Sequence, residues 1–206
     1  GLGYVYKRQV IKQVSQEIYS TGKVTDKSEI GTYWWNEFQK AFNSAYEDSF
    51  ETQRKLEYES LKKTIEYFNS TANAKELSDL MFAHWIKPPI FEESKQFFEM
   101  CPVPIYVVSN IDRDDVLKAI EYHGLKPNGI FTSEDAKSYK PRKELFQFAL
   151  NSTGLSAEQV VHIGDSLSSD IKGASAVGIN AIWINRSKRE IPNGVTAVEN
   201  LLEVYN

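Results

Sequence analysis

The sequence has few of the features that mark secreted, membrane or nucleic-acid-binding proteins. Its 206 residues include one cysteine, Cys101, which excludes an intrachain disulfide and fits a reducing compartment. No apolar run approaches the roughly 20 residues of a membrane span, and no signal-peptide pattern is present. With 24 basic and 28 acidic residues, the formal net charge of −4 favours neither nucleic acid nor an anionic membrane as a partner. We therefore expect a cytoplasmic protein that binds neither, and the sequence leaves its oligomeric state unknown.

Aromatic side chains are concentrated in the first half of the chain, where they recur at helical spacing. Ile30, Trp34, Phe38 and Phe42 follow one another four residues apart. Similar apolar stripes lie before and after them, and a Pro-Pro pair at residues 88–89 closes the last one. We predict an all-helical domain over residues 10–86, with the aromatic stripe in its interior. Residues 1–9, whose YVYKRQ run resembles a spurious translated end, are expected to be non-native or disordered.

From residue 87 onward, short β-rich runs alternate with helical patterns. The runs lie at residues 105–108, 129–132, 160–164 and 181–184. Strands separated by helices of about ten residues form parallel, doubly wound sheets. We therefore predict an α/β protein, with a Rossmann-like parallel sheet over residues 87–206.

The run VVHIGDSLSSDIKGA, residues 160–174, is the most informative segment of the chain. A buried strand ends at Gly164, and Asp165 and Asp170 follow it at the expected carboxyl edge of the sheet, where open α/β folds bind ligands. Two carboxylates held together there repel unless a cation or a proton lies between them, which points to a site for a hard metal ion. Alternatively, Asp165 is a turn residue and Asp170 complements a helix N-terminus.

Two further polar segments follow the other predicted strands. Ser109 and Asn110 directly follow the run at 105–108, where a hydroxyl and exposed backbone amides can hold a phosphate. Helix capping is the simpler interpretation of these two residue types. Lys140 precedes Pro141 at the expected entrance to a helix, where its charge opposes the helix dipole. The small cost of that placement suggests an anionic partner nearby.

In combination, Ser109, the Lys140-Pro141 pair and the GDSLSSD run closely resemble the haloacid dehalogenase-like hydrolase superfamily. The helical first half resembles the cap that one subclass of this superfamily inserts after its first strand. The similarity covers essentially the whole chain. It implies a Rossmann-like core with an all-helical cap domain.

The resemblance also implies a role for each of these residues. Ser109 and the backbone at Asn110 would bind the phosphoryl oxygens of a small phosphorylated metabolite. Lys140 would neutralise the nucleophile and the transferring group, as a catalytic and substrate-binding residue. Asp165 would be catalytic as a ligand of Mg²⁺, and Asp170 would ligate the same ion or orient its ligands. Such a site stabilises the charge that develops during phosphoryl transfer.

One departure from the family pattern concerns the nucleophile. The family's first core strand ends in a DxDxT-type motif whose first Asp attacks phosphorus and whose second Asp acts as general acid and base. No match occurs here, and the first aspartate, Asp26, lies inside the helical region. We therefore expect a fragment of a magnesium-dependent phosphatase that is inactive by itself. The missing strand is central in the family's sheet, so its neighbours would face an unfilled slot.

Two other functions remain open from the sequence. The first is hydrolytic dehalogenation of a 2-haloacid, in which a carboxylate attacks carbon and no metal is needed. The two acids of GDSLSSD argue against it, because a metal-free site has no use for a converging pair. The second is a non-catalytic binding protein with the same fold, which predicts no turnover even after an intact DxDxT segment is restored.

Overall fold

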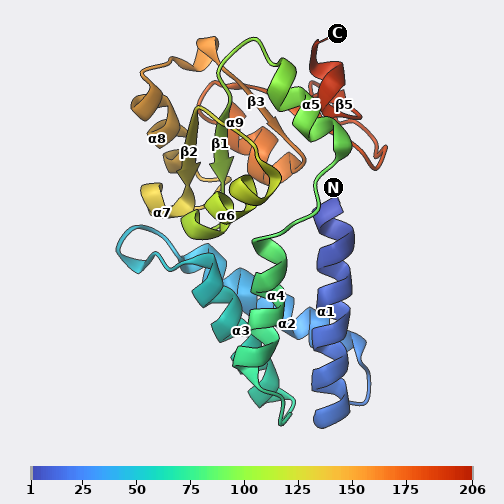
Figure 1. Ribbon diagram of the computed structural model, residues 1–206. Helices are drawn as coiled ribbons and strands as arrows, with labels where there is room; N and C mark the ends of the chain where they lie inside the picture. The colour runs from blue at the N-terminus through green and yellow to red at the C-terminus, as the bar shows by residue number, and fades with distance from the viewer. Residues whose placement is uncertain (1, 206) are drawn as a thin grey trace. The chain divides into compact units, whose positions relative to one another are not determined.

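The computed structural model describes residues 2–205, with side chains from residue 10 onward (Figure 1). The chain divides into two units, one comprising Leu2–Pro89 with Asp114–Tyr122 and the other residues 90–113 with 123–205. The first unit thus ends at Pro89 in its main segment and also includes part of a later helix. The expectation for residues 1–9 concerns a segment whose side chains are not described.

The first unit is built from helices. Its elements are α1 (Leu2–Thr21), α2 (Ser28–Ser44), the short η1 (Glu47–Ser49), α3 (Gln53–Tyr67) and α4 (Ala74–Trp85), as Figure 1 shows. Of the positions predicted from the spacing, Ile30 and Trp34 belong to the core of this unit, Phe38 is also buried, and Phe42 is only partly buried. The Trp34 indole donates a hydrogen bond of 3.2 Å to the Ser60 hydroxyl, which satisfies the polar end of a buried ring. None of the helices in the described part of the chain combines the length and hydropathy needed to cross a membrane.

Two of these helices begin at side-chain caps that the sequence supplies. The Thr52 hydroxyl accepts a hydrogen bond from the Lys55 amide at the start of α3. The Asn73 side chain accepts from the Lys75 and Glu76 amides at the start of α4. Each cap satisfies amides that have no partner inside the helix, which favours these starting points.

The first unit also contains most of α6 (Arg113–His123). The Arg54 guanidinium of α3 donates two hydrogen bonds to the Asp115 carboxylate of α6, from Nε at 2.7 Å and from Nη2 at 2.6 Å. Asp115 is fully buried, and Arg54 also lies over the Phe82 ring. This bidentate pair fixes α6 against α3 in a defined orientation.

The second unit alternates helices and strands in the predicted order. Its elements are α5 (Glu92–Met100), β1 (Tyr106–Ser109), β2 (Gly129–Thr132), α7 (Ser133–Ala136), α8 (Lys143–Thr153), η2 (Ala157–Gln159), β3 (Val161–Gly164), η3 (Leu167–Lys172), α9 (Gly173–Ser175), β4 (Asn180–Ile184), β5 (Thr196–Val198) and η4 (Leu201–Tyr205). The sequence analysis did not predict β5, a strand of three residues. Thr132 and Asp135 form a capping box that starts α7.

The strands form two small parallel sheets, and all of their pairings are parallel as predicted. One sheet pairs β1 with β2, and the other has the order β3-β4-β5. Among the described strands, β1 and β3 each pair on one edge only. No residue of β1 or β3 is buried, although strands of parallel sheets are usually covered on both faces.

Helix α8 joins the two sheets through its apolar face. It contacts β1 and β2, and its Phe146 belongs to a buried cluster against which Val108 of β1 and Ala181 of β4 pack. Phe146 also meets the His162 ring of β3 edge-on, with 5.0 Å between ring centroids. The two sheets are therefore held by one helix, although they share no described backbone hydrogen bond.

Candidate functional site

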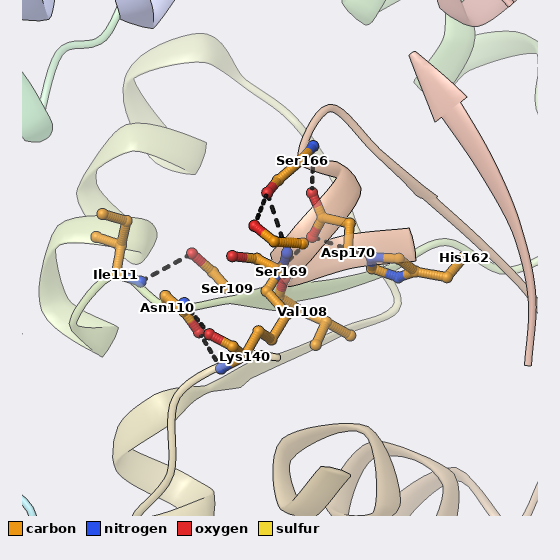
Figure 2. A network of polar contacts seen from close by, with 10 residues as sticks. Val108, Ser109, Asn110, Ile111, Lys140, His162, Ser166, Ser169 and Asp170 are labelled. Atoms are coloured by element: carbon orange, nitrogen blue, oxygen red, sulfur yellow. Dashed lines mark hydrogen bonds and ion pairs between the residues drawn. The ribbon is translucent and has the colours of Figure 1, made fainter. Parts of the chain in front are cut away.

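Lys140 lies at the centre of a buried polar network in the second unit (Figure 2). Its ammonium donates to the Val108 carbonyl at 2.9 Å and to Asp170 Oδ1 at 2.6 Å, and the residue is 8% exposed. The loop before α8 carries it, because α8 begins at Lys143. The prediction that Lys140 lies at a helix N-terminus is therefore wrong. The charge that acts most directly on its ammonium is the Asp170 carboxylate rather than a helix dipole.

The side chain of Asn110 holds Lys140 in place. Asn110 Nδ2 donates to the Lys140 carbonyl at 3.1 Å, and the Lys140 amide donates to Asn110 Oδ1 at 2.7 Å. The sequence analysis assigned Asn110 a backbone role only and missed this side-chain clamp. Asparagine is one of the few side chains that can donate and accept in this way, but no spacing in the sequence indicates which backbone segment it meets.

Asp170 is the acidic partner in the network. Its Oδ1 accepts from Lys140 and lies 3.2 Å from His162 Nε2, and its Oδ2 accepts from the Ser166 amide at 3.0 Å. Asp170 lies against Gly164, where a β-carbon would come within 2.4 Å of the carboxylate group. Both carboxylate oxygens of Asp170 thus have polar partners, so the carboxylate can hold Lys140 and His162 in defined positions.

Burial alone opposes ionisation of Asp170, but the other contacts outweigh it. Hydrogen bonds from His162 and Lys140, together with the charge of Lys140, hold the pKa of the Asp170 carboxyl well below its ordinary value of 3.8. Asp170 is therefore an anion throughout the neutral range. The pair it forms with Lys140 is a fixed dipole in a water-poor site.

This depressed pKa predicts a specific sensitivity to acid. The ionised form of Asp170 stabilises the fold fully above pH 3.8, and that stabilisation is lost as the pH falls from there through the lower pKa of the folded state. We expect Asp170→Asn to flatten the decline of the unfolding free energy between about pH 5 and about pH 2. Urea denaturation across this range measures the slope. Asp79→Asn, in the exposed Lys75–Asp79 pair, is the control variant. If the slope in Asp170→Asn equals the slopes in the wild type and in this control, the lowered pKa of Asp170 is contradicted.

Ser109 ends β1, and Figure 2 shows it beside Asn110 and Lys140. Its hydroxyl oxygen accepts a hydrogen bond from the Ile111 amide at 3.1 Å. The Asn110 carbonyl accepts from the Ser133 hydroxyl at 3.0 Å, which anchors the same turn to α7. Because Ile111 precedes α6, this hydrogen bond closes a turn after β1 and does not cap the helix. The hydroxyl of Ser109 can still donate its hydrogen to an acceptor.

Asp165 follows β3 directly and is exposed. Its backbone carbonyl accepts a hydrogen bond of 3.1 Å from the indole of Trp183, a fully buried residue of β4. Sequence reasoning did not identify this contact, which ties the turn after β3 to the neighbouring strand. The structure thus separates the two acids of GDSLSSD by environment, with Asp165 toward solvent and Asp170 buried.

The described residues contain no cluster of three or more His, Cys, Asp or Glu side chains that could enclose a metal ion. Mg²⁺ does not require such a cluster, because it commonly binds through one or two carboxylates, retained waters and substrate phosphates. The exposed carboxylate of Asp165 fits that pattern. Asp170 fits it less well, because Lys140, His162 and Ser166 already occupy its two oxygens.

Comparison with known proteins places this architecture in a family. The family model of haloacid dehalogenase-like hydrolases matches residues 11–184. HAD-hydrolase YfnB of Bacillus subtilis is 35% identical over 108 residues, which are 50% of this chain and 46% of YfnB. Glyceraldehyde 3-phosphate phosphatase of Methanocaldococcus jannaschii is 36% identical over 67 residues, or 32% of this chain and 29% of that protein. The chain thus spans about half or less of the length of these curated relatives.

Solved structures agree with the fold. A crystal structure of B. subtilis YfnB bound to magnesium superposes with a TM-score of 0.74 at 20% identity, covering 98% of this chain and 91% of that one. The L-2-haloacid dehalogenase of Xanthobacter autotrophicus gives a TM-score of 0.70 at 15% identity, covering 93% and 91%. At these identities the likeness concerns the fold alone. Because the family model spans most of the sequence, from the first helix to the end of β4, the chain belongs to the haloacid dehalogenase-like hydrolases.

Proposed function

We propose that this chain is part of a magnesium-dependent phosphatase that hydrolyses a small phosphate monoester. The observation that carries the proposal is the buried Lys140–Asp170 pair, with an ion-pair distance of 2.6 Å, beside the Ser109–Asn110 turn. A lysine held in this way presents a fixed positive charge where the carboxyl ends of the strands lie. Fixed charges and dipoles are the main source of catalysis in phosphoryl transfer.

Each residue has a part in this proposal. The ammonium of Lys140 would bind a phosphoryl oxygen with the donor it does not spend on Val108 and Asp170, and the Ser109 hydroxyl and the amides of its turn would bind others. Asp170 would keep Lys140 charged and oriented. Asp165 would hold Mg²⁺, which when bound would neutralise part of the phosphoryl charge.

The chemistry also needs a nucleophile. We propose that it is an aspartate of the family's DxDxT-type motif, carried by a strand outside these residues. The edges of β1 and β3 that lack a described strand partner, and their incomplete burial, support the addition of a strand between the two sheets. The acceptor carboxylate would then lie next to Lys140 and form a phosphoaspartyl intermediate that water hydrolyses.

The named relatives support phosphate esters as the substrate class. They include, besides the archaeal phosphatase, pyrimidine 5'-nucleotidase YjjG of Escherichia coli, which is 36% identical over 64 residues. The buried Lys140–Asp170 ion pair and the carboxylate of Asp165 favour the same choice over dehalogenation of a 2-haloacid. A cytoplasmic location, which the single cysteine suggests, belongs to this proposal as well.

The function is tested in the protein extended upstream with its own coding sequence. With p-nitrophenyl phosphate as substrate, we expect phosphate release that requires Mg²⁺ and falls at least about 100-fold in Asp165→Asn. Metal-independent turnover of 2-chloropropionate without phosphate release would replace the proposal by a dehalogenase. No turnover of either substrate would favour a binding protein.

The 206-residue chain by itself gives a second prediction. We expect no Mg²⁺-dependent hydrolysis of p-nitrophenyl phosphate above the buffer rate, because none of the proposed residues can accept the phosphoryl group as the missing aspartate does. A malachite-green assay at high protein concentration measures it. Phosphate release that Asp165→Asn abolishes would show that another residue of this chain is the nucleophile.

A further inference from the structure

His162 is a partly buried histidine to which the proposed reaction assigns no role. It lies in β3, and its side chain is 13% exposed. Its Nε2 is 3.2 Å from Asp170 Oδ1, the oxygen that also accepts the hydrogen bond from Lys140 (Figure 2). Two consecutive contacts, His162 to Asp170 and Asp170 to Lys140, therefore lead from β3 to the ammonium that would bind the phosphoryl group.

The proton on His162 is determined by its partner. An ionised carboxylate can only accept hydrogen bonds, so the nitrogen that faces Asp170 must carry a hydrogen. The orientation of the ring is determined by Phe146, which meets it edge-on at an interplanar angle of 89°. The ring thus packs against Phe146 while its Nε2 faces Asp170 Oδ1.

Lys140 could not hold the carboxylate in one orientation without help. A lysine ammonium is a compact charge on a flexible stem, and it imposes little preference on the plane of its partner. His162 at Oδ1 and the Ser166 amide at Oδ2 bind Asp170 from two backbone segments, β3 and the start of η3. These two donors fix the carboxylate, and the fixed carboxylate then fixes the ammonium.

We propose that His162 is a positioning residue that, through an Nε2–H donated to Asp170, keeps the Lys140 ammonium ordered toward the phosphoryl site. The ordering of Lys140 depends only on the contacts described here. That the ordered ammonium then serves a phosphoryl group rests on the proposed function. A role limited to packing would need the shape of the ring and no N–H.

Two substitutions separate positioning from packing. His162→Phe keeps an aromatic ring against Phe146 and removes the N–H. His162→Gln removes the ring and places an amide N–H at nearly the position of Nε2. Lys75, whose ammonium pairs with Asp79 on the surface, serves as an exposed lysine for comparison in the same spectra.

The readout is the nitrogen NMR signal of the Lys140 ammonium in the 206-residue chain, assigned through Lys140→Met. We expect a resolved, slowly exchanging signal in the wild type, hydrogen exchange at least about tenfold faster in His162→Phe, and recovery to within about threefold in His162→Gln. Unchanged exchange in His162→Phe overturns the proposal. Faster exchange in both variants overturns it too, because the ring and not the N–H would then matter.

The wild type provides a test that needs no variant, should His162→Phe fail to fold. Long-range ¹H–¹⁵N correlations report which ring nitrogen carries the hydrogen, and an Nδ1–H tautomer overturns the proposal. Failure of the proposed function is recognised separately. If the protein extended upstream hydrolyses no phosphate ester, that function fails, whereas the ammonium signal still decides the role of His162.

Discussion

Replacing Lys140 by methionine is expected to destabilise the chain by about 3 kcal/mol, because it leaves a buried carboxylate without its cation. Lys140 is 8% exposed and Asp170 is 6% exposed, so water can replace little of the lost interaction. Methionine fills much of the volume of the lysine stem, which keeps the loss of packing small. Urea denaturation at neutral pH, followed by circular dichroism, gives the difference in unfolding free energy.

Two controls locate this effect in the pair. Lys75→Met removes a surface ammonium whose partner is Asp79, with side chains 74% and 57% exposed, and should change the unfolding free energy by less than about 0.5 kcal/mol. Adding Asp170→Asn to Lys140→Met removes the isolated charge and should restore at least about half of the loss. If the double variant is as unstable as the sum of the single variants, the two groups do not interact as the structure describes.

Gly164→Ala is expected to have an effect of similar size, through close contact rather than charge. A β-carbon on residue 164 would lie 2.3–2.4 Å from the Cγ, Cβ and Oδ2 atoms of Asp170. Asp170 cannot move aside easily, because three groups bind its carboxylate and its backbone belongs to η3. We expect a loss of about 2 kcal/mol or more, measured by urea denaturation.

Gly31 provides the matched glycine control. It lies within α2, and a β-carbon there would meet nothing within 4 Å. Gly31→Ala should therefore stabilise the helix, by up to about 1 kcal/mol. The prediction for Gly164 would be contradicted if both alanine variants shifted the unfolding midpoint in the same direction and by a similar amount.

The order and type of most elements could be predicted from the sequence. The four-residue apolar spacing that places Ile30, Trp34 and Phe38 on one face corresponds to α2, and the strand predicted at residues 160–164 corresponds to β3. These signals are local, since each depends on a period of 3.6 or 2 within one segment. The strand β5 was missed because three residues are too few to establish a period.

Candidate site residues could also be proposed from the sequence, but their contacts could not. Ser109, Lys140 and Asp170 stand out by their position after predicted strands and by family resemblance. Their partners come from segments about thirty residues apart, as when Asn110 clamps the backbone of Lys140. No periodicity encodes such a pairing, because it depends on how the strands are arranged in space.

The sequence by itself determined most of the helices and strands, the family, and a set of candidate site residues, because all of these depend on residue type and short spacing. Only the tertiary structure decided that Asp165 is exposed while Asp170 is buried against Lys140 and His162. It also decided that the strands form two sheets. The physical reason is that burial and hydrogen bonding between distant segments arise only when the chain packs, and these set the charge state and the orientation of each group.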